Sequence, residues 1–402
     1  MRFTKRLYMD YASSTPVAPE VAGEMFRALR LFGNPSAPHE EGRHARALLD
    51  AARVRLARTL SVRPETLVCT GSGTESNNLA IAGVLQAFME RGARPEELHV
   101  VASAFEHPSV SEVLARFEAQ GVSVSYVAPT HEGIITPKAV LAAIRPETVL
   151  VTVACVQSEL GVIQPMKDIS RALNGVRSAR AQTPQSYVPE APLPLLHSDA
   201  SQGALFLDVC PERLGVDLAT YDAQKVEGPK GVGLLYRSST VPLAPLVLGG
   251  KQERSVRAGT ENVAGVVGMA RAFERALAGR RARSARVEKI RDYFLSLLAT
   301  RVPSARVNGS IKERLPNNVH ISIPGVDGDY LAVLLDHEGV AVSPRSACMA
   351  SGSVSKAVVA LGEDEAAARG TIRFTFAPNV SKYDARRAVS ALVRSLTIID
   401  RK

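Results

Sequence analysis

Residues 66–129 decide the fold, and they read "TLVCTGSGTESNNLAIAGVLQAFMERGARPEELHVVASAFEHPSVSEVLARFEAQGVSVSYVAP". Three short runs rich in β-branched residues, at 66–70, 97–103 and 122–129, alternate there with two segments of helical periodicity. This alternation is typical of βαβ units, which build a mostly parallel sheet covered by helices. Four more strand-like runs follow along the chain, "TVLVTVACV", "PLLHSDAS", "LATYDA" and "GVGLLY". The predicted class is therefore α/β, and ligands on such sheets bind beyond the C-terminal ends of the strands.

The chain of 402 residues is long enough for two domains. After about Ala264 the pattern changes to a long amphipathic Arg/Ala helix, "NNVHISIPG", a helix "GDYLAVLLDHEG", a Ser-rich loop, "GTIRFTFAP" and a last helix. We predict a large α/β domain over residues 16–264. Residues 1–15 and 265–402 are predicted to form a smaller α+β domain. The segment 174–196, rich in Pro, Ser and Gln, is predicted to be an exposed excursion.

Composition excludes several classes of protein. Apolar residues make up 46% of the chain, yet no apolar run approaches the roughly 20 residues of a membrane helix, and the N-terminus lacks the apolar core of a signal peptide. We expect a cytoplasmic protein without a membrane partner. The four cysteines lie far apart without a C-x-x-C pair, which argues against a metal site and a disulfide framework. The net charge of +9 lies largely in Arg-rich helical segments, which favours solvated helix faces over direct nucleic-acid binding.

Polar residues of three kinds follow the predicted strands. In "CTGSGTESNN", Gly73 and Thr74 precede a helix predicted to begin at Glu75, whose free N–H groups can face an anion, although ordinary turn and cap chemistry uses the same residues. In "HSDASQG", Asp199 either caps a helix or meets a cation or several donors, and Gln202 lies beside it. In "YDAQKVEGPKGVG", Lys225 is either a surface lysine or a desolvated lysine that forms a Schiff base.

These three sites have a common explanation in pyridoxal phosphate. That cofactor needs a phosphate site, a lysine, and an acid that keeps its ring nitrogen protonated. His107, which follows another strand, can stack on the ring, although a lone histidine is more often structural. Cys348 in "VSPRSACMASGS" lies in a loop of small polar residues where a thiol stays accessible, whereas Cys69 and Cys155 are expected to pack in the core.

At this point the motifs identify a family. The chain resembles the cysteine desulfurases of the class-V aminotransferase group, NifS/IscS type, nearly end to end. The following segments occur in the family's order: "YMDYASSTP", "FGNPSAPHEEG", "GSGTESNNLAI", "FEHPSV", "ELGVIQP", "SDASQ", "QKVEGPKGVGLLY", "VRAGTENV", "SACMASGS" and "TIRFTFAP". The resemblance implies the fold of pyridoxal-phosphate-dependent transferases of fold type I. In that fold the large domain has a mostly parallel seven-stranded sheet, the smaller C-terminal domain carries the catalytic cysteine loop, and the protein is a homodimer.

The resemblance also implies roles for single residues. Lys225 holds the cofactor as a Schiff base, Asp199 contacts the pyridine nitrogen, and His107 stacks on the ring and moves protons. Further cofactor-binding residues implied in this way are Gly73, Thr74, Ser158, Gln202 at the ring hydroxyl, Gln224, and Thr260 at the phosphate of the other subunit. Arg373 pairs with the substrate carboxylate, and Asn34 lies near the substrate.

The implied reaction converts L-cysteine to L-alanine and leaves the sulfur on Cys348 as a persulfide. The implied acceptor is an iron–sulfur scaffold or a tRNA thiolation enzyme, and the "SACxxS" pattern is of the type I kind with a long delivering loop. One alternative is an enzyme like selenocysteine lyase, and another is a non-catalytic sulfur-relay relative. A tRNA-binding protein is a third reading, which rests on charge alone.

The sequence departs from the family before the lysine, where Ser and His are replaced by Asp222 and Gln224. A carboxylate at about 4 Å from the cofactor phosphate costs about 4 kcal/mol at an effective dielectric near 20. We therefore expect Asp222 to turn away, to pair with Arg254 or Arg257, or to be protonated. Ser158 replaces an Asn of the family, so its shorter hydroxyl leaves more of the ring contact to Gln202. The sequence ends soon after "SLTIIDRK", without the longer tail that some type I enzymes use to dock a scaffold, which leaves the acceptor open.

Overall fold

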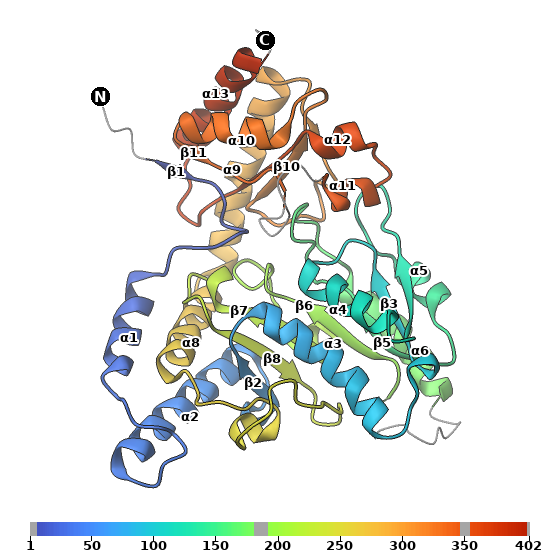
Figure 1. The fold of residues 1–402 in the computed structure, drawn as a ribbon. Helices are drawn as coiled ribbons and strands as arrows, with labels where there is room; N and C mark the ends of the chain where they lie inside the picture. Colours follow the sequence, from blue (N-terminus) through green and yellow to red (C-terminus); the bar gives the residue numbers. More distant parts are fainter. Residues whose placement is uncertain (1–5, 181–191, 346–353, 400–402) are drawn as a thin grey trace.

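The computed structural model describes residues 6–180, 192–345 and 354–399. A seven-stranded sheet in the order β2-β8-β7-β6-β5-β3-β4 forms the lower half of the molecule in Figure 1. Its strands are β2 Leu67–Thr70, β3 His99–Ser103, β4 Ser123–Val127, β5 Thr148–Thr152, β6 Leu195–Asp199, β7 Leu218–Asp222 and β8 Gly233–Arg237. Only β8 runs antiparallel to its neighbours; the other pairs are parallel. The predicted mostly parallel seven-stranded sheet is confirmed.

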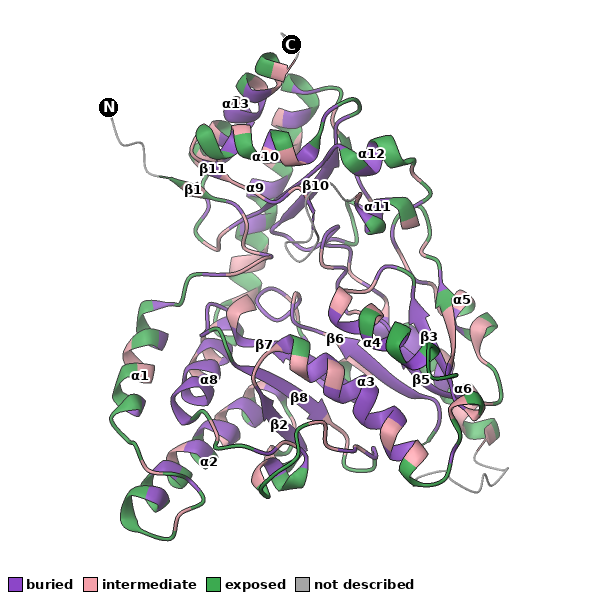
Figure 2. Ribbon diagram, in the orientation of Figure 1, coloured by how far each residue is buried: buried purple, intermediate pink, exposed green. Residues whose placement is uncertain are grey.

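Both faces of this sheet are covered by helices, and Figure 2 shows its strands largely buried, except for the edge strand β4, where only Val127 is buried. The helices α3 Gly73–Glu90 and α4 Pro108–Glu118 cover one face. The other face is covered by α2 Glu40–Leu60, α5 Pro137–Ala143, α6 Met166–Arg180 and α8 Val263–Leu277. Alternate strand residues serve the two layers: Val100 packs in the cluster beneath α3 and α4, and Val101 in the cluster on the opposite face. This explains why the strands are continuous apolar runs.

Short polar turns link these strands to the helices that follow them. Ser72 caps α3 by accepting a hydrogen bond from the Glu75 backbone at 3.1 Å, so α3 begins at Gly73, two residues before the predicted start at Glu75. His107 caps α4, which has Pro108 at its first position. These turns lie at the C-terminal edge of the sheet. Elsewhere in the large domain, the short elements are α1 Pro19–Leu29, α7 Pro211–Leu214, η1 Pro64–Thr66, η2 Pro95–Glu97, η3 Ala223–Lys225 and η4 Gln252–Ser255.

The smaller α+β domain lies above the sheet in Figure 1 and contains both described chain ends. It has a three-stranded antiparallel sheet in the order β12-β10-β9, and a parallel pair of β1 with β11. Its elements are β1 Leu7–Tyr8, α9 Arg280–Arg301, β9 Arg306–Val307, β10 Asn318–Ser322, α10 Gly328–His337, β11 Val340–Ala341, α11 Lys356–Ala360, α12 Glu365–Arg369, β12 Thr371–Thr375 and α13 Lys382–Ile399. Phe294 of α9 packs on Phe374 and Phe376 at ring distances of 5.0 and 5.2 Å. These rings join the long helix to the sheet.

Two sequence predictions about local structure were wrong. The single long helix predicted after Ala264 is two helices, because the chain is extended at Ala278 and left-handed at Gly279 with φ of 73°. The excursion predicted for 174–196 is too long, because α6 continues to Arg180 and β6 begins at Leu195. Residues 181–191 of that segment lie outside the described residues.

The domain limits at 15/16 and 264/265 stay a prediction. Helix α8 starts beside the predicted limit and packs against α1 and α2 of the large domain. Within the described residues, no helix combines the length and the apolar character required to cross a membrane.

Candidate active site

A cavity of about 290 Å³ lies at the C-terminal edge of the large sheet. It is lined by nine of the predicted site residues: Gly73, Thr74, His107, Ser158, Asp199, Gln202, Gln224, Lys225 and Arg373. The parallel strands explain this convergence, because β6 ends at Asp199 and β7 ends at Asp222, on the same edge of the sheet. Arg373 reaches the cavity from β12 of the small domain. The cavity is therefore built from both domains.

Asp199 presents a hydrogen-bonded carboxylate to the cavity. Its Oδ2 accepts from the Asn77 amide at 2.8 Å, and its Oδ1 accepts from the Ser201 backbone N–H at 2.9 Å. Two residues earlier, His197 is buried within hydrogen-bond distance of the hydroxyls of Thr152 at 2.9 Å and Thr220 at 3.2 Å. Burial lowers the pKa of His197 to about 4, so its ring is neutral at neutral pH. The histidine two residues before Asp199 on β6 therefore carries no charge at neutral pH.

Lys225 is half-buried at the end of η3, and its amine is tied to the N-terminal segment. The Nζ atom donates to the carbonyl oxygens of Ala12 and Ser13, both at 2.7 Å. Gln202 donates to the same Ala12 carbonyl at 2.9 Å. The lysine is thus held in the cavity by backbone acceptors, which excludes the reading as a solvated surface lysine.

Arg373 is a buried cation, with 2% of its surface exposed. It donates to Asp10 Oδ1 at 3.0 Å, to Ser13 Oγ at 2.8 Å and to the Ser158 carbonyl at 2.9 Å. Among the described groups its Nε has no hydrogen-bond partner. An unsatisfied buried guanidinium N–H is costly, so this atom favours the binding of an anionic ligand.

Five residues that line the cavity form what we call the anion cup: Gly73 and Thr74 at the start of α3, Ser201 after β6, and Asp222 and Gln224 at the end of β7 and in η3. The Gly73 N–H lies at the N-terminus of an 18-residue helix, where the helix dipole favours negative charge. Ser201 Oγ is buried and, within the described residues, has no partner. These donors fit the phosphate of pyridoxal phosphate, and together with Asp199 and Lys225 they make the set that the cofactor requires.

One carboxylate already lies in the anion cup. Asp222 Oδ2 accepts from Gly73 N at 3.1 Å and Oδ1 accepts from Gln224 N at 3.0 Å. The expectation that Asp222 turns away or pairs with Arg254 or Arg257 was therefore wrong, and the third alternative, that it is protonated, stays a prediction. Arg254 donates to the Leu67 carbonyl, and Arg257 pairs with Glu75 at 2.8 Å. The free donors at the helix start attracted the carboxylate more strongly than these distant cations.

His107 faces the cavity from the N-terminus of α4. Its Nδ1 accepts a hydrogen bond from the Ser109 backbone N–H at 3.1 Å and lies 2.8 Å from Ser109 Oγ. Burial lowers the pKa of His107; Asp199 opposes this shift, and Lys225 adds to it. The ring is therefore neutral at neutral pH, whether it acts as a stacking residue, a donor or a base.

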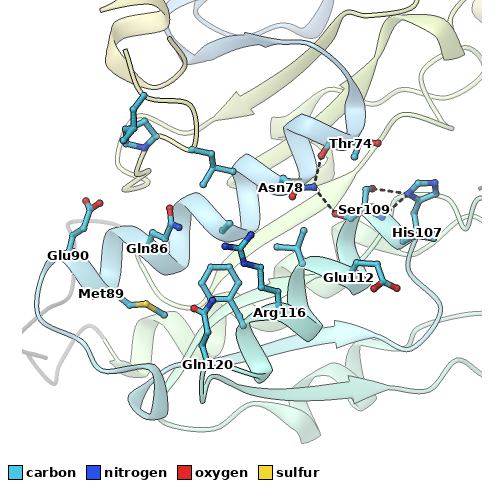
Figure 3. A pocket seen from close by; sticks show the side chains of 17 residues that line it. Thr74, Asn78, Gln86, Met89, Glu90, His107, Ser109, Glu112, Arg116 and Gln120 are labelled. Carbon is cyan, nitrogen blue, oxygen red and sulfur yellow. Dashed lines mark hydrogen bonds between the residues drawn. The ribbon is translucent and has the colours of Figure 1, made fainter. Parts of the chain in front are cut away.

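A wider groove of about 950 Å³ adjoins the cavity and shares Thr74, His107 and Ser109 with it. Figure 3 shows this groove between α3 and α4, with His107 and Ser109 at the end of the groove where Thr74 begins α3. Asn78 spans the two helices by donating to the Thr74 carbonyl at 2.9 Å and to the Ser109 carbonyl at 3.4 Å. The cavity therefore has an approach along the surface of the large domain.

Two predicted residues lie apart from the cavity, and a third lies outside the described residues. Asn34 and Thr260 are exposed and do not line it, so their roles at a substrate and at the other subunit's phosphate stay predictions. Cys348 lies outside the described residues. Cys69 and Cys155 are buried as expected, and burial raises the pKa of each thiol to about 12.

Four contacts in the cavity were not predicted from the sequence: those of Asp10 and Ser13 with Arg373, of Asn77 with Asp199, and of Ser109 with His107. The segment "YMDYASSTP" contributed to the family resemblance but gave no partner for Asp10. In the parts of the chain that the structure describes, no group of three or more His, Cys, Asp or Glu side chains is arranged to hold a metal ion.

Comparison with known proteins agrees with this geometry. Residues 7–387 match the class-V aminotransferase family, and the chain belongs to that family. It is 35% identical over 392 residues to the cysteine desulfurase IscS of Dictyoglomus turgidum, which covers 97% of this chain and 94% of that protein. It is 36% identical over 377 residues to the IscS of Ectopseudomonas mendocina, covering 92% and 87%.

Solved structures give the same result. A NifS-like protein superposes with a TM-score of 0.86 and 30% identity over 98% of this chain and 100% of its own. SspA in complex with cysteine superposes with a TM-score of 0.76 and 32% identity over 93% and 99%. Within the class-V aminotransferases the chain is therefore a cysteine desulfurase, a group of enzymes that depend on pyridoxal phosphate.

Proposed function

We propose that this chain binds pyridoxal phosphate in the described cavity and converts L-cysteine to L-alanine, with transfer of the sulfur to Cys348. The observation that carries the proposal is the convergence of Lys225, Asp199 and Arg373 on one cavity beside the anion cup. Stability of the fold does not require these groups to meet, namely a lysine amine, a carboxylate, a buried guanidinium and an anion site. Binding of the cofactor and substrate does. When bound, the cofactor acts as an electron sink that weakens bonds at the α-carbon of an amino acid.

Different residues of the cavity would bind different parts of the cofactor. Asp199 would accept a hydrogen bond from the protonated pyridine nitrogen, and the Asn77 and Ser201 bonds keep its carboxylate oriented. Lys225 would form the covalent attachment and afterwards hold the α-proton at its Nζ. The anion cup would hold the phosphate together with Thr260 of a second subunit, and Gln202 would donate to the ring hydroxyl.

Arg373 orients the substrate through its carboxylate. A guanidinium pairs with a carboxylate in a planar, bidentate geometry, and the Nε atom of Arg373 is available for one of these bonds. Asp10 and Ser13 hold the guanidinium plane in place. Asn34 contributes a contact near the substrate.

The sulfur transfer needs no further reactant. The Cys348 thiolate attacks the sulfur of bound L-cysteine, a new S–S bond forms, and the electron pair of the broken C–S bond passes to the substrate carbon. Protonation of that carbon releases L-alanine, so one cysteine and one thiol give one alanine and one persulfide. An iron–sulfur scaffold or a tRNA thiolation enzyme then takes the sulfur by thiol exchange.

We infer a homodimer from the same chemistry, because Thr260 has no role in its own cavity. Large exposed apolar side chains on the large domain support it, namely Phe26 at 68%, Leu29 at 65%, Phe32 at 84% and Leu248 at 81%. Large exposed apolar patches often mark protein–protein interaction sites. Leu248 also lines the α3–α4 groove.

Two variants test the function. Cys348→Ser should keep the visible absorption of the lysine-bound cofactor and lose persulfide formation, measured by mass spectrometry after addition of L-cysteine. Lys225→Ala should lose that absorption. Sulfide release at an undiminished rate in Cys348→Ser would contradict the sulfur assignment, and persistent lysine-type absorption in Lys225→Ala would contradict the site.

A further inference from the structure

Four side chains from three elements form one hydrogen-bonded chain along the wall of the cavity: Asp199, Asn77, Ser109 and His107. They come from β6, α3 and the start of α4. Asn77 is 1% exposed and Ser109 is 8% exposed, so water does not compete for these bonds.

Asp199 sets the first direction. A carboxylate has no hydrogen to give and can only accept. The Asn77 amide must therefore direct its NH₂ group toward Asp199 Oδ2, at 2.8 Å, because the flipped amide would place two oxygens against each other. The second hydrogen of the same NH₂ group goes to Ser109 Oγ, also at 2.8 Å.

Ser109 passes the direction on to His107. Its hydroxyl accepts from Asn77, so its only hydrogen is left to point at His107 Nδ1, 2.8 Å away. The Ser109 backbone N–H donates to the same Nδ1 at 3.1 Å. Figure 3 shows both contacts reaching one side of the imidazole ring. Two donors at Nδ1 leave no place for a proton there, so the proton of the neutral ring is on Nε2.

We propose that Asn77 and Ser109 are positioning residues that fix His107 as the tautomer with its proton on Nε2. His107 then offers the cavity an N–H donor and no lone pair, because its Nδ1 lone pair is used by Ser109. It cannot take the α-proton of the substrate, so that proton goes to Lys225 alone. The conclusion that Lys225 alone takes the α-proton rests on the proposed function. The tautomer of His107 follows from the hydrogen bonds and does not depend on that function.

The structure also explains why the His107 ring does not take up a second proton. An imidazolium carries N–H at both nitrogens, and its Nδ1–H would meet the Ser109 backbone N–H. Hydrogen bonds to the neutral form disfavour the charged form. Burial acts in the same direction on the pKa of His107.

Nitrogen-15 spectra of histidine-labelled protein, as purified with its cofactor, test the proposal directly. His107 is assigned by the signal that is lost in His107→Gln. The wild-type signal should show a protonated Nε2 and an unprotonated Nδ1 at neutral pH. A protonated Nδ1 would overturn the proposal without any variant having to fold.

Variants of Ser109 and Asn77 test the relay. Ser109→Ala removes the hydroxyl but keeps the backbone donor, so the Nδ1 signal should shift and kcat for L-cysteine should fall about tenfold with little change in KM. Ser109→Thr keeps the hydroxyl and should restore both. Asn77→Leu should produce the same spectral shift as Ser109→Ala. Unchanged spectra and kcat in Ser109→Ala would refute the relay.

These outcomes are distinguishable from a failure of the proposed function. If the chain is no desulfurase, alanine formation is absent in the wild type while the nitrogen signals of His107 still report the tautomer. If only the relay is wrong, the wild type forms alanine and the spectra contradict the assignment.

Discussion

Replacement of Asp222 by Ser should strengthen cofactor binding. Asp222 is 7% exposed and its Oδ2 receives the Gly73 N–H at 3.1 Å, which is the bond that a phosphate oxygen would take. Phosphate and carboxylate therefore compete for one donor. A pair of unit negative charges about 4 Å apart costs about 4 kcal/mol at an effective dielectric near 20.

The size of the effect lies between two limits. Full relief of about 4 kcal/mol would tighten cofactor binding by about a thousandfold. A carboxylate that rotates away or takes up a proton avoids part of this repulsion. The wild type then still loses its bonds from Gly73 and Gln224, each of which contributes about 1.5–3 kcal/mol, and this loss sets the lower limit. We expect Asp222→Ser to bind pyridoxal phosphate at least about tenfold more tightly than the wild type.

The assay is a titration of cofactor-free protein with pyridoxal phosphate, followed by the absorption of the lysine-bound form. Inorganic phosphate as a competitor reports on the anion cup alone. Asp222→Asn keeps the shape and removes the charge, so it should also bind more tightly, and Asp168→Ser on the exposed side of α6 should change nothing. Weaker binding in both Asp222 variants would refute the reasoning and make Asp222 a productive contact.

Two further predictions concern the substrate and stability. Arg373→Lys keeps the charge but loses the planar fork, so KM for L-cysteine should rise at least about tenfold while the absorption of bound cofactor stays unchanged; an unchanged KM in alanine-formation assays would contradict the carboxylate role. Burial lowers the pKa of His197 from 6.5 to about 4, so the unfolded chain binds the extra proton and the free energy of unfolding falls as pH drops from 6.5 toward 4. In urea unfolding, His197→Gln should reduce this slope by up to about 1.4 kcal/mol per pH unit, whereas the exposed His44→Gln should leave it as it is.

Local pattern was sufficient to predict most of the large domain. The strands are apolar runs bounded by turn residues, and the residues that follow them, His107, Asp199 and Lys225, were found because parallel strands place their C-terminal ends on one edge. The break at Ala278 and Gly279 was missed because a single glycine is compatible with a helical pattern.

Contacts between distant segments could not be predicted in this way. Asp10 and Arg373 are separated by 363 positions, and no periodicity links them. The orientation of Asp222 was missed for another reason: it depends on which donors are free at the start of α3, and this is known only once the helix cap is placed. The relay through Asn77 and Ser109 likewise needs two helices in register.

The tie between the first and last parts of the chain has a consequence for biosynthesis. The carbonyls of Ala12 and Ser13 that hold Lys225 lie beside residues that bond β12, where Thr375 donates to the Met9 carbonyl at 2.8 Å. The ribosome makes this N-terminal segment long before β12, because 366 positions separate Met9 from Thr375, so the segment waits without its partners until β12 emerges. Such long-range pairing is slow to form. The contacts that hold Lys225 are thus expected to form late, after the large sheet, and the catalytic site is complete only once β12 has been made.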